Sequence, residues 1–275
     1  MMKLPSLIPA AVISSTFFSL SLNAQESKPN IIFILADDLG YGELTCYNKN
    51  AIVKTPNIDR LAQNGIRMTQ AYASPVCSPT RTCLLTGKFP QKSGVYGNFE
   101  GAIPGIGPSR KSFVEDIKIE GYKTAWFGKW HQGWDVSNHP LNNGFDLGYV
   151  FLGGMHDYWD VSNGDHYIGG PFAPNAFVFD GFRVAKSMRY FTEEITDRAV
   201  KLIQEKSSVP FFMYLAYNAP HTPFQAPDKA ILKYLKAGCD TLEAVRSAMI
   251  DVMDQNIGRV LDDPQERIDL SQKNT

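Results

Sequence analysis

A cysteine, a proline and an arginine stand two residues apart from one another in this chain, as Cys77, Pro79 and Arg81. Proline is tolerated in the first turn of a helix because the amide that it lacks has no partner there, so we expect a helix that begins near Cys77. Arg81 then lies on the same helical face. A helix start favours an anion, either a thiolate or a bound oxyanion, and a guanidinium can bind such an oxyanion. The alternative is a buried free cysteine near an unrelated arginine.

Other polar groups follow three continuous apolar runs of the kind found in strands that are buried on both faces. The runs span residues 30–36, 122–127 and 210–217. They are followed by Asp37 and Asp38, by Lys129 and His131, and by His221, in that order. In open α/β sheets, functional groups gather beyond the carboxyl ends of the strands. We therefore expect these side chains to meet Cys77 and Arg81.

The residue types at this predicted meeting point suit one kind of chemistry. The paired aspartates, Asp37 and Asp38, suit a hard cation such as Ca²⁺ or Mg²⁺. Lys129 and His131 are two residues apart on extended backbone and can reach one ligand together. With His221, they suit the oxygens of a tetrahedral oxyanion and the proton of its leaving group. The set predicts a site for sulfate or phosphate esters, although each group alone has a structural alternative such as a turn aspartate, a surface lysine or a loop histidine.

The remaining pattern alternates strands with helices. Helices are predicted at 55–65, with Thr55 as its cap, and at 112–120, 192–206 and 240–261, and a further strand is predicted at 66–73. This alternation indicates an α/β fold in which a large, mostly parallel sheet lies between helices. The long aromatic segment 132–185 is either a substrate-facing lobe or a structural loop that packs its own aromatic side chains.

Composition excludes some partners and indicates a compartment. With 275 residues, 44% hydrophobic and 20% charged, the chain suits one large core. A net charge of −1 gives no basic field for nucleic acid.

Residues 1–24 have the form of a signal peptide. Pro5 and Pro9 interrupt this segment too much for a stable membrane span, although an uncleaved anchor is the alternative. We therefore expect a secreted or periplasmic protein. Export favours disulfide bonds between its four cysteines. If Cys77 is used for catalysis, three cysteines remain, so at least one of these three is unpaired.

Five stretches of this sequence, in order, resemble the motifs of one enzyme family. They are K-P-N-I-I-F-I-L-A-D-D-L-G-Y-G at 28–42, T-P-N-I-D-R-L-A at 55–62, C-S-P-T-R followed by L-L-T-G within 77–87, G-K-W-H at 128–131 and A-P-H-T-P-F at 219–224. Together they look like the type I sulfatases of the alkaline-phosphatase superfamily. The resemblance covers about residues 28–261 and implies a sulfuric ester hydrolase that acts on a sulfated carbohydrate or an aryl sulfate.

The resemblance also implies a chemically modified nucleophile beside a metal. In this family the cysteine of C-x-P-x-R is oxidised to Cα-formylglycine by a maturation enzyme, so Cys77 would be the precursor of the nucleophile. Asp37, Asp38 and the modified residue 77 would hold Ca²⁺ or Mg²⁺. The hydrated aldehyde would attack sulfur and later expel sulfate.

Four further residues take family roles by their positions in the motifs. Arg81 would steady the hydrated aldehyde, while Lys129 and His221 would bind the sulfate. His131 would assist the release of sulfate from the intermediate. One of the histidines or a later lysine would protonate the leaving oxygen. The implied partners are a sulfated small molecule or glycan and the formylglycine-generating enzyme.

The sequence departs from the family pattern after its last predicted helix. Family members usually continue with a strand that ends in Asp-Asn-Gly and completes the metal site, then with a lysine and a C-terminal domain. We therefore expect 25–275 to be an incomplete N-terminal catalytic domain with weak or no turnover. Two other hypotheses remain, namely a phosphodiester or phosphonate ester hydrolase of the same superfamily and a non-catalytic product that binds oxyanions or glycans.

Overall fold

The structure is a computed structural model that describes residues 28–99, 105–106, 110–160, 178–187 and 189–262. The predicted signal peptide, residues 1–24, lies outside these ranges, as does 161–177 of the predicted aromatic lobe. Within the described ranges, no helix is long and apolar enough to cross a membrane.

Strands and helices alternate along most of the described chain. The strands are β1 (Ile31–Asp37), β2 (Lys123–Lys129), β3 (Leu147–Phe151), β4 (Val178–Asp180), β5 (Arg183–Val184) and β6 (Phe211–Pro220). The helices are α1 (Pro56–Asn64), α2 (Cys77–Thr86), α3 (Pro90–Ser93), α4 (Phe113–Ile119), α5 (Phe191–Gln204), α6 (Asp228–Lys236) and α7 (Thr241–Leu261), and short 3₁₀ turns span Tyr41–Glu43, Val136–Asn138 and Pro140–Asn142. The three apolar runs and the four predicted helices are confirmed to within a few residues.

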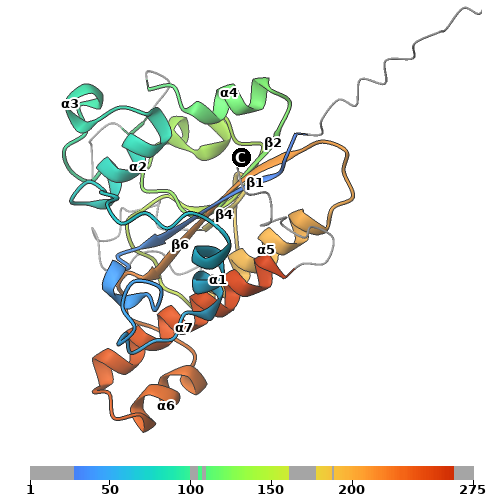
Figure 1. Cartoon of the computed structure of the whole chain (residues 1–275). Helices are drawn as coiled ribbons and strands as arrows, with labels where there is room; N and C mark the ends of the chain where they lie inside the picture. Colours follow the sequence, from blue (N-terminus) through green and yellow to red (C-terminus); the bar gives the residue numbers. More distant parts are fainter. Residues whose placement is uncertain (1–27, 100–104, 107–109, 161–177, 188, 263–275) are drawn as a thin grey trace, which may run out of the picture.

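The six strands form one mixed sheet in the order β1-β6-β2-β3-β4-β5. β1, β6, β2 and β3 are parallel, while β4 and β5 continue the sheet in antiparallel pairs. Helices α2, α3 and α4 lie on one side of the sheet and α1, α5 and α7 on the other (Figure 1). The predicted α/β fold is confirmed, and the last of the three apolar runs lies between the first two.

The central strand β6 shows why its sequence is apolar without alternation. Its residues Met213 and Leu215 pack in a core with Ile195 of α5 and the inner face of α7. The intervening Phe212 and Tyr214 pack in a second core with the α2 and α4 side. Every residue of β6 is buried, so both faces require apolar side chains.

The aromatic segment contributes to these cores. Tyr149 and Phe151 of β3, and Tyr158 after it, are fully buried among the residues that contact α5. Trp159 and Phe182 are partly exposed. In its described part the segment therefore packs much of its aromatic surface inward, and its role toward a substrate stays a prediction.

The strand predicted at 66–73 is wrong. These residues have irregular backbone and all are exposed, with Ile66 at 83% and Tyr72 at 90%. The apolar residues suggested a strand, but the segment pairs with no strand in the described part of the chain. Pairing with a neighbour, rather than composition alone, makes a strand. The chain reaches Cys77 through an exposed loop.

Helix α1 begins in a different way from the prediction. Thr55 occupies the cap position, but its hydroxyl donates to Asp59 and caps no amide. Asp254 of α7 accepts hydrogen bonds from the backbone amides of Asn57 at 3.2 Å and Ile58 at 2.9 Å. A carboxylate from a helix almost 200 residues away thus satisfies the first turn of α1.

We predict that Asp254→Ala destabilises the protein by about 2–3 kcal/mol, because two helix-start amides lose their acceptor in a buried place. Urea unfolding followed by circular dichroism measures the loss. Asp262→Ala is the control, because Asp262 is an exposed partner of Arg60 and should cost less than about 1 kcal/mol. Equal losses in the two variants would contradict the capping role.

Candidate active site

A buried ion cluster joins the first strand to two other elements. The ammonium of Lys129, at the end of β2, contacts the carboxylate of Asp37, at the end of β1. The guanidinium of Arg81, on α2, lies 3.4 Å from the other oxygen of Asp37 and donates at 2.8 Å to the backbone oxygen of Lys129. All three side chains are buried. One carboxylate is therefore shared by two cations.

Lys129 reaches this cluster because the strand turns over at Gly128. Phe127 packs on the side of α5, and a residue two positions further along regular strand would face the same way. Gly128 has a φ of 106°, and a Cβ built on it would lie 2.0 Å from the backbone oxygen of Ala216. The side chain of Lys129 instead faces α2, with its Nζ 3.5 Å from the Sγ of Cys77.

Helix α2 begins at Cys77, as the proline pattern predicted. The backbone amide of Ser78 donates to Asn98 at 3.1 Å, and the hydroxyl of Ser78 donates at 2.8 Å to the backbone oxygen of His131. The second bond ties the first turn of α2 to the segment that directly follows β2. Cys77 is partly buried at that junction.

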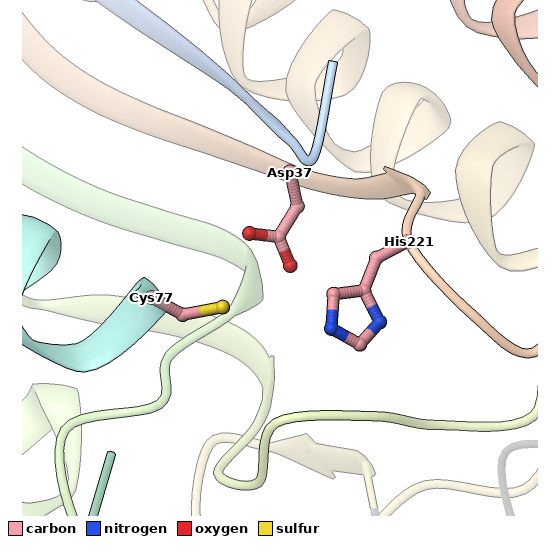
Figure 2. Close-up of side chains that lie close together, drawn as sticks. All are labelled: Asp37, Cys77 and His221. Atoms are coloured by element: carbon pink, nitrogen blue, oxygen red, sulfur yellow. The ribbon is translucent and has the colours of Figure 1, made fainter. Parts of the chain in front are cut away.

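His221 approaches the same point from the end of β6. Figure 2 shows its ring facing Asp37 and Cys77. Its Nδ1 lies 2.7 Å from the backbone oxygen of Thr222, which fixes Nδ1 as the donor and leaves Nε2 for the site. The hydroxyl of Tyr158 donates to the backbone oxygen of His221 at 2.8 Å and braces the loop.

Three possible ligand atoms, one each from Asp37, Cys77 and His221, lie within 4.8 Å of one another. Asp38 stands beside them, with Oδ2 3.6 Å from Nε2 of His221, and its side chain is mostly exposed. The structure thus brings together the predicted residues Asp37, Asp38, Cys77 and His221.

The cations and burial set the charges of the site. Burial alone would raise the pKa of Asp37, but Lys129 and Arg81 lower it to about 2, so this carboxyl is ionised. Burial raises the pKa of Cys77 although Lys129 opposes the rise. Cys77 is consequently a neutral thiol, and the helix start does not make it the thiolate that is one of the sequence-based alternatives.

His131 lies behind the cluster rather than in its centre. Its backbone has a φ of 52°, and its ring lies against Gly154, where a Cβ would come within 2.7 Å of Cε1. Burial, followed by the charges of Lys129 and Arg81, lowers the pKa of His131 to about 2. Its Nδ1 is buried without a partner among the described residues. His131 is thus a neutral imidazole.

Residues 29–269 match the family model for the protein family Sulfatase. The chain belongs to the sulfatase family. An arylsulfatase of Klebsiella aerogenes is 31% identical over 236 residues, which are 82% of this chain and 50% of that protein. Human steryl-sulfatase is 41% identical over 137 residues, 45% of this chain and 23% of that protein.

A solved structure is also similar to this chain. The crystal structure of Ps i-CgsB in complex with k-i-k-neocarrahexaose is 33% identical, with a TM-score of 0.76 over 86% of this chain and 55% of that chain. This sulfatase chain spans about half the length of both the arylsulfatase and Ps i-CgsB.

The sulfatase residues described here do not form a complete site for Ca²⁺ or Mg²⁺. Such ions take six or more oxygen ligands, whereas the cluster offers the carboxylates of Asp37 and Asp38 together with a thiol and an imidazole. Lys129 and Arg81 also occupy Asp37. The metal stays a prediction.

Sequence reasoning missed two groups near the cluster. Asn218 of β6 is buried, and neither polar atom of its amide has a partner among the described residues. Gln132 accepts from Thr82 at 2.6 Å and donates to the backbone oxygen of Ser78 at 3.0 Å, which fastens β2 to α2. Gln132 directly follows His131 in the G-K-W-H motif, and that adjacency is the signal that could have found it.

We predict that Gly128→Ala is far more destabilising than Gly181→Ala. Both glycines have positive φ, but a Cβ at Gly181 meets nothing within 4 Å, so that variant should lose only about 1–2 kcal/mol. At Gly128 the Cβ would overlap the backbone of β6, so the end of β2 must move. Thermal unfolding measures the difference, and similar melting temperatures would show that Gly128 does not direct Lys129.

Proposed function

We propose that this chain carries the site of a sulfuric ester hydrolase that uses residue 77 after its oxidation to formylglycine. The observation that carries the proposal is the convergence of two buried cations, Lys129 and Arg81, on the carboxylate of Asp37 beside Cys77. A sulfate monoester is an anion with tetrahedral oxygens, and these fixed donors suit it. Family membership supports the same conclusion.

We assign the binding of the sulfate group to Lys129 and His221. Nζ of Lys129 lies 3.5 Å from Sγ of Cys77, and Nε2 of His221 belongs to the same cluster. Cations fixed beforehand around developing negative charge stabilise a transition state without reorganisation. The backbone ties of Lys129 to Arg81 and of His221 to Tyr158 supply that rigidity.

The neutral thiol of Cys77 favours its use as a precursor over its use as a thiolate nucleophile. Formylglycine supplies a hydrated aldehyde, which provides an oxygen nucleophile and a route for sulfate release. Arg81, one turn along α2, is placed to orient that group.

We assign to His131 the uptake of a proton during sulfate release, which is the role that its motif position implies. Burial, the main cause of its low pKa, opposes this uptake, and a bound anion would offset only the smaller effects of Lys129 and Arg81. His221 can give the proton that the departing alcohol requires only when both ring nitrogens carry a proton, because its Nδ1–H is held by the backbone oxygen of Thr222.

The substrate is proposed as a sulfated carbohydrate or an aryl sulfate. The similarity to an arylsulfatase and to a protein crystallised with k-i-k-neocarrahexaose supports these two classes. Export by residues 1–24, maturation by a formylglycine-generating enzyme and a Ca²⁺ or Mg²⁺ ion that involves Asp37 and Asp38 are parts of the same proposal.

The proposal is tested with the full 275-residue chain produced together with a formylglycine-generating enzyme. Mass spectrometry of the peptide that contains Cys77 should show the loss of H₂S and the gain of one oxygen. The matured chain should then bind inorganic sulfate, and the weak turnover that is expected of it should release sulfate from an aryl sulfate faster than phosphate from the matching aryl phosphate. An unmodified thiol, or a preference for the phosphate ester, would refute the proposed mechanism.

We predict that Lys129→Met lowers sulfate release by about 10²–10³-fold, the loss typical for removal of one preorganised charge-stabilising group. Lys123→Met is the matched control, because Lys123 belongs to the same strand but pairs with Glu205 near the surface. Initial rates on an aryl sulfate measure both variants. Equal rates for Lys129→Met and Lys123→Met would exclude a role for Lys129 in binding the sulfate.

A further inference from the structure

Asp37 and Asp38 lie at the end of β1, where the regular pairing with β6 breaks down. The pairing of β1 with β6 is regular as far as Ala36 opposite Tyr217, and it then shifts so that Asp37 is opposite Pro220. Asp38 follows with a φ of 61°, in the left-handed region that a residue other than glycine rarely adopts. Contacts other than the strand ladder must therefore hold the backbone of residues 37–40.

Arg246 of α7 provides those contacts. Its Nη2 donates to the backbone oxygen of Asp38 at 2.9 Å and to Oε2 of Glu43, also at 2.9 Å. The same Oε2 of Glu43 accepts from the backbone amide of Gly40 at 2.7 Å. One guanidinium and one carboxylate thus bind a carbonyl and an amide on either side of Leu39.

Arg246 links the turn after β1 to a helix that is distant in sequence. Arg246 and Asp38 are 208 residues apart, and α7 is anchored on the opposite side of the sheet from α2. A planar guanidinium can bind a carbonyl and a carboxylate at once, whereas an ammonium is a point charge without that fixed fork. The direction of the turn after β1 therefore depends on the shape of the Arg246 side chain as well as on its charge.

We propose that Arg246 is a positioning residue that holds the Asp38–Gly40 turn and thereby sets the carboxylates of Asp37 and Asp38 for the site. The inference rests on the proposed function only for its effect on sulfate. Asp37 carries the contacts to Lys129 and Arg81, and Asp38 stands 3.6 Å from His221. Release of the turn would displace both carboxylates and, with Asp37, the ammonium of Lys129.

A cavity beside Arg246 offers a direct test. It has a volume of about 310 Å³, and Arg246, Glu43, Asn48 and Ser247 are among the residues that line it. Truncation in Arg246→Ala would enlarge this cavity and leave Glu43 and the carbonyl of Asp38 without their partner. Free guanidinium ion could then enter and restore the missing contacts.

The experiment compares the matured full chain with its Arg246→Ala, Arg246→Lys and Arg259→Ala variants. Arg259 is the control because it also lies on α7 and pairs with an aspartate, Asp197, at the surface. Hydrogen exchange of residues 38–43, affinity for inorganic sulfate and melting temperature are measured for each protein. The measurements are repeated with dilute guanidinium chloride and with potassium chloride at the same ionic strength, which separates rescue from salt screening.

Arg246→Ala should exchange faster in residues 38–43 and lose about tenfold or more in sulfate affinity, since small displacements in a site have large effects. Guanidinium should restore both quantities, and Arg246→Lys should restore them in part. Arg259→Ala should change neither, even if it lowers the melting temperature by as much.

Unchanged exchange in residues 38–43 of Arg246→Ala overturns the inference, and so does a loss of affinity that guanidinium fails to restore in the folded variant. If the unmutated chain binds no sulfate, the proposed function fails, while the exchange data with and without guanidinium still decide whether Arg246 holds the turn.

Discussion

The carboxylate of Asp37 is the point on which the site depends, because it brings together side chains from β1, β2 and α2. Burial of a lone carboxylate is costly, and here two cations, Lys129 and Arg81, compensate for that cost. The same two cations lie beside Cys77, where the proposed function requires donors for a sulfate group. The contacts that stabilise buried Asp37 therefore also fix the groups to which sulfate binding is assigned.

Much of this arrangement could be predicted from local patterns. Continuous apolar runs identified β1, β2 and β6, and the polar residues that follow each run identified most of the cluster. Pro79 located the start of α2 because its physical effect is confined to one turn of helix. Signals of this kind depend only on neighbours in sequence, so they can be seen in sequence.

The parts that could not be predicted depend on distant partners. Nothing local shows that β6 inserts between β1 and β2, that Asp254 caps α1 in place of Thr55, or that Arg246 binds the turn after β1. The prediction of a strand at 66–73 was wrong for the same reason, because a strand requires a neighbouring strand that the local sequence does not reveal. The side of the sheet to which the Lys129 side chain points depends on Gly128. A glycine is required there because the backbone of β6 leaves no room for a Cβ, and this contact is not visible in the local sequence.

The position of β6 also has a consequence for how the protein folds. The backbone amide of Phe211, at the start of β6, donates a hydrogen bond to the side chain of Asn30, which is 181 residues away in sequence. Asn30 directly precedes β1, whose described pairing is with β6. During synthesis, β1 therefore has no partner strand until the residues of β6 have been added. Pairings of such long range close large loops and form slowly, and an apolar strand that waits without a partner is exposed to association with other chains. The centre of the site therefore cannot form before β6 has been made, and while β1 is unpaired the new chain is exposed to aggregation.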